Sequence, residues 1–124
     1  MIIRTTLPWP PSATSPNGSQ GNYRAKAQAG ADYKLTCWAL LKEAGSAVNR
    51  LPAGATVRRV TLTYCPPPRV SRYDFDNMGR RMKHGLDALA EALGVDDGAW
   101  QSMLQQRGER CKGGAVLVEI EAAQ

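Results

Sequence analysis

Apolar and polar side chains alternate along three short stretches of the chain, and each stretch predicts a β-strand. Residues 2–7 are rich in β-branched types, which favour extended backbone. Residues 57–65 carry apolar side chains at every second position from Val60 to Tyr64, the period of a half-buried strand. Residues 115–121 repeat this alternation. Prolines follow the first two stretches, and they end the strands because proline cannot donate to a sheet ladder.

Two longer stretches carry apolar side chains at three- and four-residue steps, which is typical of amphipathic helices. The first covers residues 31–48. The second covers residues 77–93 and ends before Gly94, a residue that often stops a helix. Its apolar stripe predicts a core or dimer surface and consists of Met78, Met82, Leu86, Leu89 and Leu93. Residues 100–107 fit neither period.

The interleaving of strands and helices predicts a mixed α/β fold, in which a small mixed β-sheet is flanked by two main helices. A chain of 124 residues without an internal repeat or a linker is expected to form one domain, residues 1–124. No stretch approaches the roughly 18 apolar residues of a membrane span, and we expect neither a membrane partner nor an organic cofactor. The three cysteines are widely spaced, so we expect reduced thiols in a cytoplasmic protein rather than a disulfide framework.

The net charge of the chain is positive, which suggests a negatively charged partner. Lys and Arg number 16 against 11 Asp and Glu, a formal net charge of +5. This excess is compatible with a polyanion and is weak evidence on its own. Its placement is more informative, because basic side chains flank an acidic segment at residues 74–76 and recur in a later loop. The side chains expected to contact DNA phosphates are Arg69, Arg72, Arg80, Arg81, Arg107, Arg110 and Lys112.

The acidic segment carries Asp74 and Asp76, two positions apart. In extended backbone this spacing puts both carboxylates on one side, whereas in a helix they would point roughly 200° apart. With prolines upstream and a helix expected from Asn77, extended backbone is the prediction. Asp96 and Asp97 follow the second helix and would join the pair if the sheet folds back. Mg²⁺ prefers such hard oxygen ligands.

A polar face continues from the acidic pair along the second helix. At about 100° per residue, Arg80, Lys83 and Asp87 lie within roughly 60° of Asp76. Helical side chains lean toward the N-terminus, so Lys83 could reach a site at the helix start. There it could offset phosphate charge or protonate a leaving oxygen. Carboxylates for a metal beside cations for phosphates are the elements of a nuclease site.

These motifs, in this order and over most of the chain, resemble the RusA family of Holliday-junction resolvases. They are Leu7-Pro-Trp-Pro-Pro-Ser12, Asp74-Phe-Asp-Asn77, Lys83, Leu86-Asp-Ala-Leu89 and Gly94-Val-Asp-Asp97. The resemblance implies a homodimeric Mg²⁺-dependent endonuclease of mixed α/β fold, encoded by bacteria or their prophages. It implies that four-way junction DNA is the substrate and that paired symmetric nicks resolve it during recombination or repair.

The resemblance also implies roles for four residues. Asp74 and Asp76 match the two metal-binding aspartates of the family's first acidic motif. Asp97 matches the second residue of the later acidic pair, which also binds the metal. Lys83 matches the catalytic lysine when the comparison is anchored on Asp87.

Two of these matches have competitors in the sequence. Arg80 competes with Lys83 when the comparison is anchored on Asp76. Asp96 stands one position before Asp97 and could take its place. Both choices stay open on the sequence alone.

Plainer interpretations accompany the functional ones. Asp74 to Asn77 could form a helix cap or turn, and Lys83 with Asp87 could form an exposed ion pair of about 0.3–0.5 kcal/mol. His84 is expected at the surface. The tryptophans are expected to pack rather than to stack on bases: Trp9, Trp38 and Trp100. At the level of function, the alternatives are a junction or branched-DNA binding module without activity, and a nuclease for flaps or other branched DNA.

Overall fold

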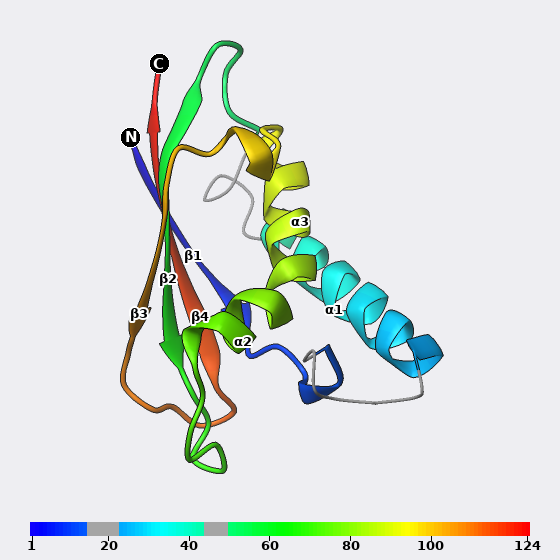
Figure 1. Ribbon diagram of the computed structural model, residues 1–124. Coiled ribbons are helices and arrows are strands. Elements are labelled where there is room, and N and C mark those ends of the chain that lie inside the picture. The colour runs from blue at the N-terminus through cyan, green and yellow to red at the C-terminus, as the bar shows by residue number, and fades with distance from the viewer. Residues whose placement is uncertain (15–22, 44–49) are drawn as a thin grey trace.

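A computed structural model describes residues 1–14, 23–43 and 50–124 of the chain. Its strands form one sheet in the order β1-β4-β2-β3, with bounds β1 Ile2–Pro8, β2 Thr56–Cys65, β3 Met103–Arg107 and β4 Ala115–Ala123. The α-helices lie on one side of this sheet (Figure 1) and are α1 Tyr23–Glu43, α2 Phe75–Arg81 and α3 Lys83–Leu93. Short 3₁₀ turns are η1 Ser12–Thr14 and η3 Asp97–Ala99. The predicted mixed α/β class is confirmed.

The sheet combines antiparallel and parallel pairs. β4 pairs antiparallel with both β1 and β2, and β2 pairs parallel with β3. A parallel pair needs a long crossover connection, which α2, α3 and η3 supply here. Tyr64 is in register with Arg107. The carboxyl ends of β2 and β3 therefore lie side by side, and the loops that follow them meet at that end of the sheet.

The inward face of the sheet and the helical stripe form the core. Val60, Leu62 and Tyr64 of β2 are fully buried, as the alternation predicted. Every residue of the stripe from Met78 to Leu93 is at most 7% exposed, which places the stripe in the core rather than on a free surface. Such burial contributes about 1.5–3 kcal/mol for each large apolar side chain.

The N-terminal strand is tied to the helices. Helix α1 packs against α3, and its Tyr33 hydroxyl donates to the carbonyl of Pro8 at 2.6 Å. The helices are also close together, because a Cβ at Gly85 would lie 3.0 Å from the Tyr33 ring. A small residue at this point lets α3 approach α1.

Both predicted helices differ from the observed ones at their bounds. α1 begins at Tyr23 rather than at residue 31, and the predicted segment 44–48 lies outside the described residues. The second predicted helix, 77–93, begins two residues earlier at Phe75 and is divided at Met82 into α2 and α3. The prediction of one continuous helix was therefore wrong. The two parts lie at an angle to one another (Figure 1), and the bend keeps both Met78 and Leu86 in the core.

Some apolar residues lie where the periodicity did not place them. Trp9 and Trp100 are packed, 8% and 9% exposed, but Trp38 is 38% exposed beneath the Lys42 ammonium, 5.2 Å from its ring centroid. The prediction that Trp38 packs was therefore wrong. The stretch that fitted no period contains β3, an edge strand in which only Gln105 is half-buried. A strand with little burial on either face has no reason to show alternation.

Two further expectations concern the chain as a whole. Cys37, Cys65 and Cys111 are free, as the spacing predicted. Among the helices of the described residues, none combines the length and the apolar character that a bilayer crossing requires.

Candidate active site

Asp74 caps the helix that carries the rest of the acidic segment. Its backbone is extended, with φ −115° and ψ 157°, and its side-chain Oδ1 accepts a hydrogen bond from the Asn77 amide at 2.7 Å. A cap of this kind satisfies one of the orphan amides at a helix start. The helix therefore begins at Phe75 and takes in Asp76.

This early helix start changes the geometry of the acidic pair. Because Asp76 lies in the first helical turn, extended backbone does not hold both carboxylates on one side, and that prediction was wrong. Asp74 lines a small hollow with Arg72 and Arg81, while Asp76 lines a neighbouring one. The plainer interpretation of Asp74 as a helix cap is confirmed.

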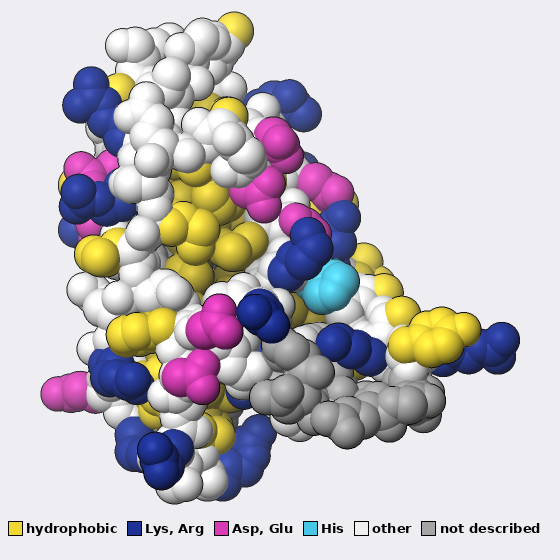
Figure 2. Space-filling model, in the orientation of Figure 1, with side chains coloured by type: hydrophobic (Ala, Val, Ile, Leu, Met, Phe, Trp, Pro, Cys, Tyr) yellow, Lys and Arg dark blue, Asp and Glu magenta, His cyan; other side chains and the backbone are white. Residues whose placement is uncertain are grey.

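The neighbouring hollow joins residues from four elements and is called the acidic hollow below. It has a volume of about 390 Å³, and Asp76 of α2, Lys83 of α3 and Asp97 of η3 all line it, with Arg80 and Gln105. On the face that Figure 2 shows, acidic and basic side chains are interspersed beside exposed apolar atoms between the sheet and the helices. Three of the four residues that the sequence singled out for chemistry thus share one hollow.

Two ion pairs hold charges at the rim of the acidic hollow. The carboxylate of Asp76 lies 3.5 Å from the Arg80 guanidinium, and the Lys83 amine lies 3.9 Å from the Asp87 carboxylate. The side chains of Asp76 and Lys83 are 81% and 71% exposed, so these pairs are weak and can be exchanged for a ligand. Arg80 and Lys83 both reach the hollow, so geometry does not choose between them.

Geometry does separate Asp96 from Asp97. Asp96 stands at the start of η3 and lines a different hollow, together with Lys34 and Glu91. Of these two aspartates, Asp97 is the one that lines the acidic hollow. Trp100 fixes this turn, because its buried ring donates from Nε1 to the carbonyl of Val95 at 3.2 Å.

Sequence reasoning missed Gln105, which forms the β3 side of the acidic hollow. Its side-chain Oε1 accepts a hydrogen bond from the Tyr64 hydroxyl at 2.5 Å. Tyr64 is fully buried, and burial raises the pKa of its hydroxyl far above the usual value, so it remains a donor. The amide nitrogen of Gln105 donates to no group within the described part of the chain and can face a ligand. A glutamine in a stretch without a clear period gave no signal for this role.

Arg107 connects β3 to the acidic segment. Its guanidinium lies 4.6 Å from the ring centroids of both Tyr73 and Phe75, and it donates to the carbonyl of Tyr73 at 3.4 Å. Tyr73 and Phe75 flank Asp74 in the sequence. The stacked rings therefore hold the segment that leads into α2 against the edge of the sheet.

Arg81 differs from the other basic residues proposed to contact DNA. It is 8% exposed, donates to the carbonyl of Pro10 at 2.5 Å and lies 5.8 Å from the Trp9 ring centroid. Burial lowers the pKa of its guanidinium. The prediction that Arg81 contacts DNA is therefore corrected, because its side chain is buried. The remaining basic candidates are exposed: Arg69, Arg72, Arg80, Arg107, Arg110 and Lys112.

The structure also corrects the expected number of converging carboxylates. Across residues 1–14, 23–43 and 50–124, no group of three or more His, Cys, Asp or Glu side chains is arranged to hold a metal ion. The carboxylates that share the acidic hollow are those of Asp76 and Asp97. Convergence of three or four carboxylates was predicted and does not occur, because Asp74 caps a helix and Asp96 faces another hollow.

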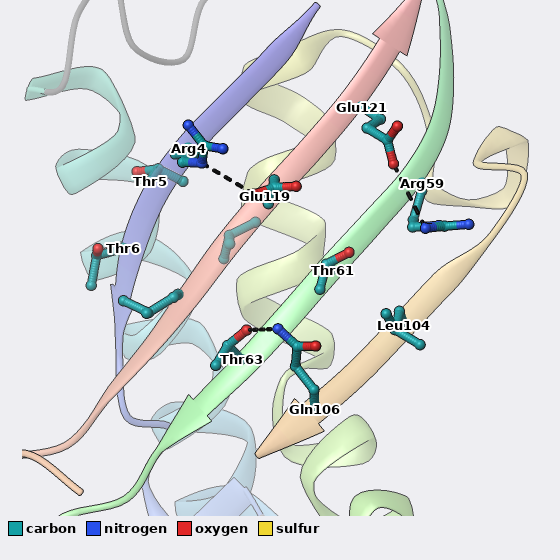
Figure 3. Close-up of a pocket in the computed structure, with 12 residues that line it drawn as sticks. Arg4, Thr5, Thr6, Arg59, Thr61, Thr63, Leu104, Gln106, Glu119 and Glu121 are labelled. Atoms are coloured by element: carbon teal, nitrogen blue, oxygen red, sulfur yellow. Dashed lines mark hydrogen bonds and ion pairs between the residues drawn. The ribbon is translucent and has the colours of Figure 1, made fainter. Parts of the chain in front are cut away.

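A larger hollow of about 560 Å³ lies on the opposite face of the sheet, away from the helices (Figure 3). Its charged side chains are paired across strands: Arg4 with Glu119 at 3.1 Å, and Arg59 with Glu121 at 3.9 Å. Gln106 donates to the Thr63 hydroxyl at 2.7 Å. Since these groups satisfy one another, this hollow offers no chemistry comparable to that of the acidic hollow.

Comparison with known proteins places the chain in a family. No protein-family model matches it. The structure of hydrogenase maturation protein HypE in complex with ATP is similar at a TM-score of 0.34 and 13% identity, over 97% of this chain and 29% of that one. A similarity this weak does not establish a common fold. An uncharacterized protein of Xylella fastidiosa (strain Temecula1) is 30% identical over 115 residues, 93% of this chain and 73% of that protein. The chain belongs to the same family as this Xylella protein.

Proposed function

We propose that the protein is a Mg²⁺-dependent endonuclease that resolves four-way DNA junctions by paired symmetric nicks. One observation carries the proposal. Asp76, Lys83 and Asp97 lie on three different elements, α2, α3 and η3, yet they line one exposed hollow. All three residues stand in the ordered motifs of the sequence, so their meeting in one hollow supports a shared role.

The acidic hollow suits Mg²⁺. This ion commonly takes one or two protein carboxylates, keeps several waters and completes its shell with substrate phosphates. Asp76 and Asp97 supply two carboxylates, and both are exposed, which leaves room for waters and a phosphodiester. When bound, the ion would supply Lewis acidity and lower the pKa of a water molecule. Asp74 would contribute by fixing the start of α2 and hence the position of Asp76.

The chain's own cations would handle the phosphate. The Lys83 amine can stabilise negative charge that develops on a phosphodiester, or protonate the oxygen that leaves. Arg80 can take this part only if its contact with Asp76 at 3.5 Å is released. The amide nitrogen of Gln105 can donate to a phosphate oxygen and so orient the DNA backbone.

The choice of a four-way junction as substrate rests on the resemblance to the RusA family. The exposed arginines would serve equally well in a binding module without activity or in a nuclease for flaps. A bacterial or prophage origin and a cytoplasmic location belong to the same proposal, and the relative from Xylella is in line with a bacterial source.

Nicking of a labelled synthetic four-way junction tests the proposal, with Mg²⁺ or with EDTA. A linear duplex of the same sequence and a flap substrate serve as comparisons. Symmetric cuts that require Mg²⁺ and are confined to the junction are expected. Tight binding without cuts under any divalent metal would instead favour the binding module, and faster cutting of the flap would favour the flap nuclease.

The paired nicks imply a homodimer, because a two-fold arrangement presents one site to each of two symmetry-related strands. Sedimentation of the protein with and without junction DNA tests this part. A dimer mass is expected, and a monomer that cuts both strands at equal rate would contradict it.

A further inference from the structure

Two loops enclose a second hollow, the arginine pocket, at the carboxyl ends of the parallel strands β2 and β3. Its volume is about 420 Å³, and Arg72, Arg107 and Arg110 line it together with Ser71. The loops that follow these two strands meet here, and each of them contributes side chains to the arginine pocket.

Backbone hydrogen bonds hold the two loops together. The Gly108 amide donates to the carbonyl of Tyr64 at 2.8 Å, and the Cys111 amide donates to that of Pro66 at 3.1 Å. Gly108 permits this approach, because a Cβ there would lie 2.7 Å from the Thr63 methyl. These hydrogen bonds fix the backbone of both loops before a ligand binds, so the loops lose less conformational entropy on binding.

Two of the arginines are also fixed in place. Arg110 donates to the carbonyls of Pro67 and Val70. Arg107 is held by its aromatic neighbours and by the carbonyl of Tyr73, as described above. Each guanidinium has five N–H donors, so both retain donors for a ligand after these contacts.

The charges of the arginine pocket are not neutralised by the protein. Ion pairs of the described residues involve Arg4, Lys34, Arg59, Arg80 and Lys83. Arg72, Arg107 and Arg110 pair with no carboxylate in that part of the chain. Asp74 lines an adjoining hollow with Arg72 without forming an ion pair, and Glu109 is exposed in the same loop. The carbonyl contacts orient the guanidinium groups but leave their positive charge.

We propose that Arg72, Arg107 and Arg110 form a phosphate-binding pocket that holds one backbone phosphate of DNA beside the cleavage site. Guanidinium groups match the geometry of phosphate oxygens and bind them in bidentate fashion. Phe75 connects the two sites, since its ring faces Arg107 and also lines the acidic hollow. DNA as the source of the phosphate rests on the proposed function, whereas the pocket itself does not.

The first experiment measures junction affinity in EDTA, where no cutting occurs, over a range of salt concentrations. Arg72→Gln removes one charge from an exposed side chain that forms no hydrogen bond or ion pair with the described residues, so the variant should fold. If one phosphate contact is lost, the slope of log affinity against log salt should fall by about 0.9. Arg59→Gln, on the opposite face of the sheet, is the matched control and should leave the slope unchanged.

The second experiment titrates wild-type protein with inorganic phosphate at constant ionic strength and follows amide NMR signals. Saturable shifts at Ser71 and Gly108 are expected, and chloride should not produce them. Arg72→Gln should weaken this binding. Arg107→Lys should weaken it as well, because it retains the charge but loses the guanidinium fork, and thermal unfolding verifies that it folds.

The outcomes distinguish the pocket from the nuclease. If the slope and the phosphate shifts depend on Arg72 while no junction is cut, the pocket stands and the nuclease fails. If junctions are cut while Arg72→Gln changes neither measurement, the pocket is overturned. Phosphate shifts with an unchanged salt slope would overturn DNA as the source and indicate a free phosphate ligand.

Discussion

The carboxylate of Asp76 lies 3.5 Å from the guanidinium of Arg80, one helical turn further along α2. Both side chains are largely exposed, 81% and 62%, so the pair adds little to stability. The pair places the Arg80 guanidinium beside the Asp76 carboxylate, the group that would otherwise attract a metal ion. A metal ion bound at Asp76 would displace Arg80, which would then be free to contact a phosphate.

Replacement of Asp76 by asparagine tests the metal site directly. Asp76→Asn removes a ligand charge and leaves the basic surface intact. Loss of a partner behind a metal ligand already costs about 10–100-fold, so nicking should fall by at least about 10-fold while junction binding persists. Nicking and gel-shift assays on the same preparation measure both quantities. Asp96→Asn is the matched control, since Asp96 faces another hollow. Full activity of Asp76→Asn would refute the assignment of the acidic hollow.

Lys83 should act on the rate of the reaction rather than on stability. Lys83→Met removes the amine at the acidic hollow, and nicking should fall by about 10²-fold or more. Its exposed pair with Asp87 at 3.9 Å is worth less than about 1 kcal/mol, so the unfolding midpoint in urea should barely move. Lys34→Met is the matched control, because Lys34 also pairs with a carboxylate of α3, that of Glu91 at 2.7 Å, but does not line the acidic hollow. If Arg80→Met abolishes nicking and Lys83→Met does not, Arg80 holds the role.

Strands and the helical stripe could be predicted because burial on one face imposes a period on the sequence. Val60, Leu62 and Tyr64 alternate for this reason, and Met78 to Leu93 recur at helical steps. The helix start could not be predicted, because aspartate serves equally as a ligand and as a cap. Only the hydrogen bond from the Asn77 amide to Asp74 decides between these roles.

The candidate site was predicted in part. Asp76, Lys83 and Asp97 were found because they stand in ordered motifs. Gln105 and the burial of Arg81 were not found, since both depend on contacts between distant segments: Gln105 with Tyr64, and Arg81 with Pro10. Such contacts follow from tertiary packing and leave no period in the sequence.

The hydrogen bond from Tyr64 to Gln105 should matter for both stability and activity. Tyr64→Phe keeps the ring and removes the donor, so the unfolding free energy should fall by about 1 kcal/mol. Gln105 would also lose its fixed position, and nicking should fall while junction binding is retained. Tyr73→Phe is the matched control, because its ring still faces Arg107. Unchanged nicking by Tyr64→Phe would show that Gln105 has no part in the reaction.

Two leucines on helices test the assignment of the core. Leu89 is fully buried in α3 and Leu35 is 66% exposed on α1. Leu89→Ala should lower the unfolding free energy by about 2–5 kcal/mol through lost burial and a cavity, whereas Leu35→Ala should change it by no more than about 0.5 kcal/mol. Urea unfolding monitored by circular dichroism measures both values. Equal losses would mean that α1 and α3 are packed differently.

Buried thiol and hydroxyl groups should make the protein less stable at alkaline pH. Burial raises the pKa of Cys37 from 9.0 to about 11, and it also raises the pKa of Tyr33 and of Tyr64. Above about pH 9 the unfolded chain therefore loses protons that the folded chain retains. The unfolding free energy should fall as pH rises through this range. Below about pH 9 these groups should leave the unfolding free energy unchanged.

The slope expected from Cys37 alone is on the order of 1 kcal/mol per pH unit between its two pKa values. Urea unfolding at intervals from pH 7 to 10.5 measures it. Cys37→Ala should reduce but not abolish the first part of the decline, which begins near pH 9, because burial also raises the pKa of Cys65. The later part should remain, because tyrosine ionises in the unfolded chain only near its ordinary value of 10.0. An identical decline in wild type and Cys37→Ala would show that the thiol is not the group responsible.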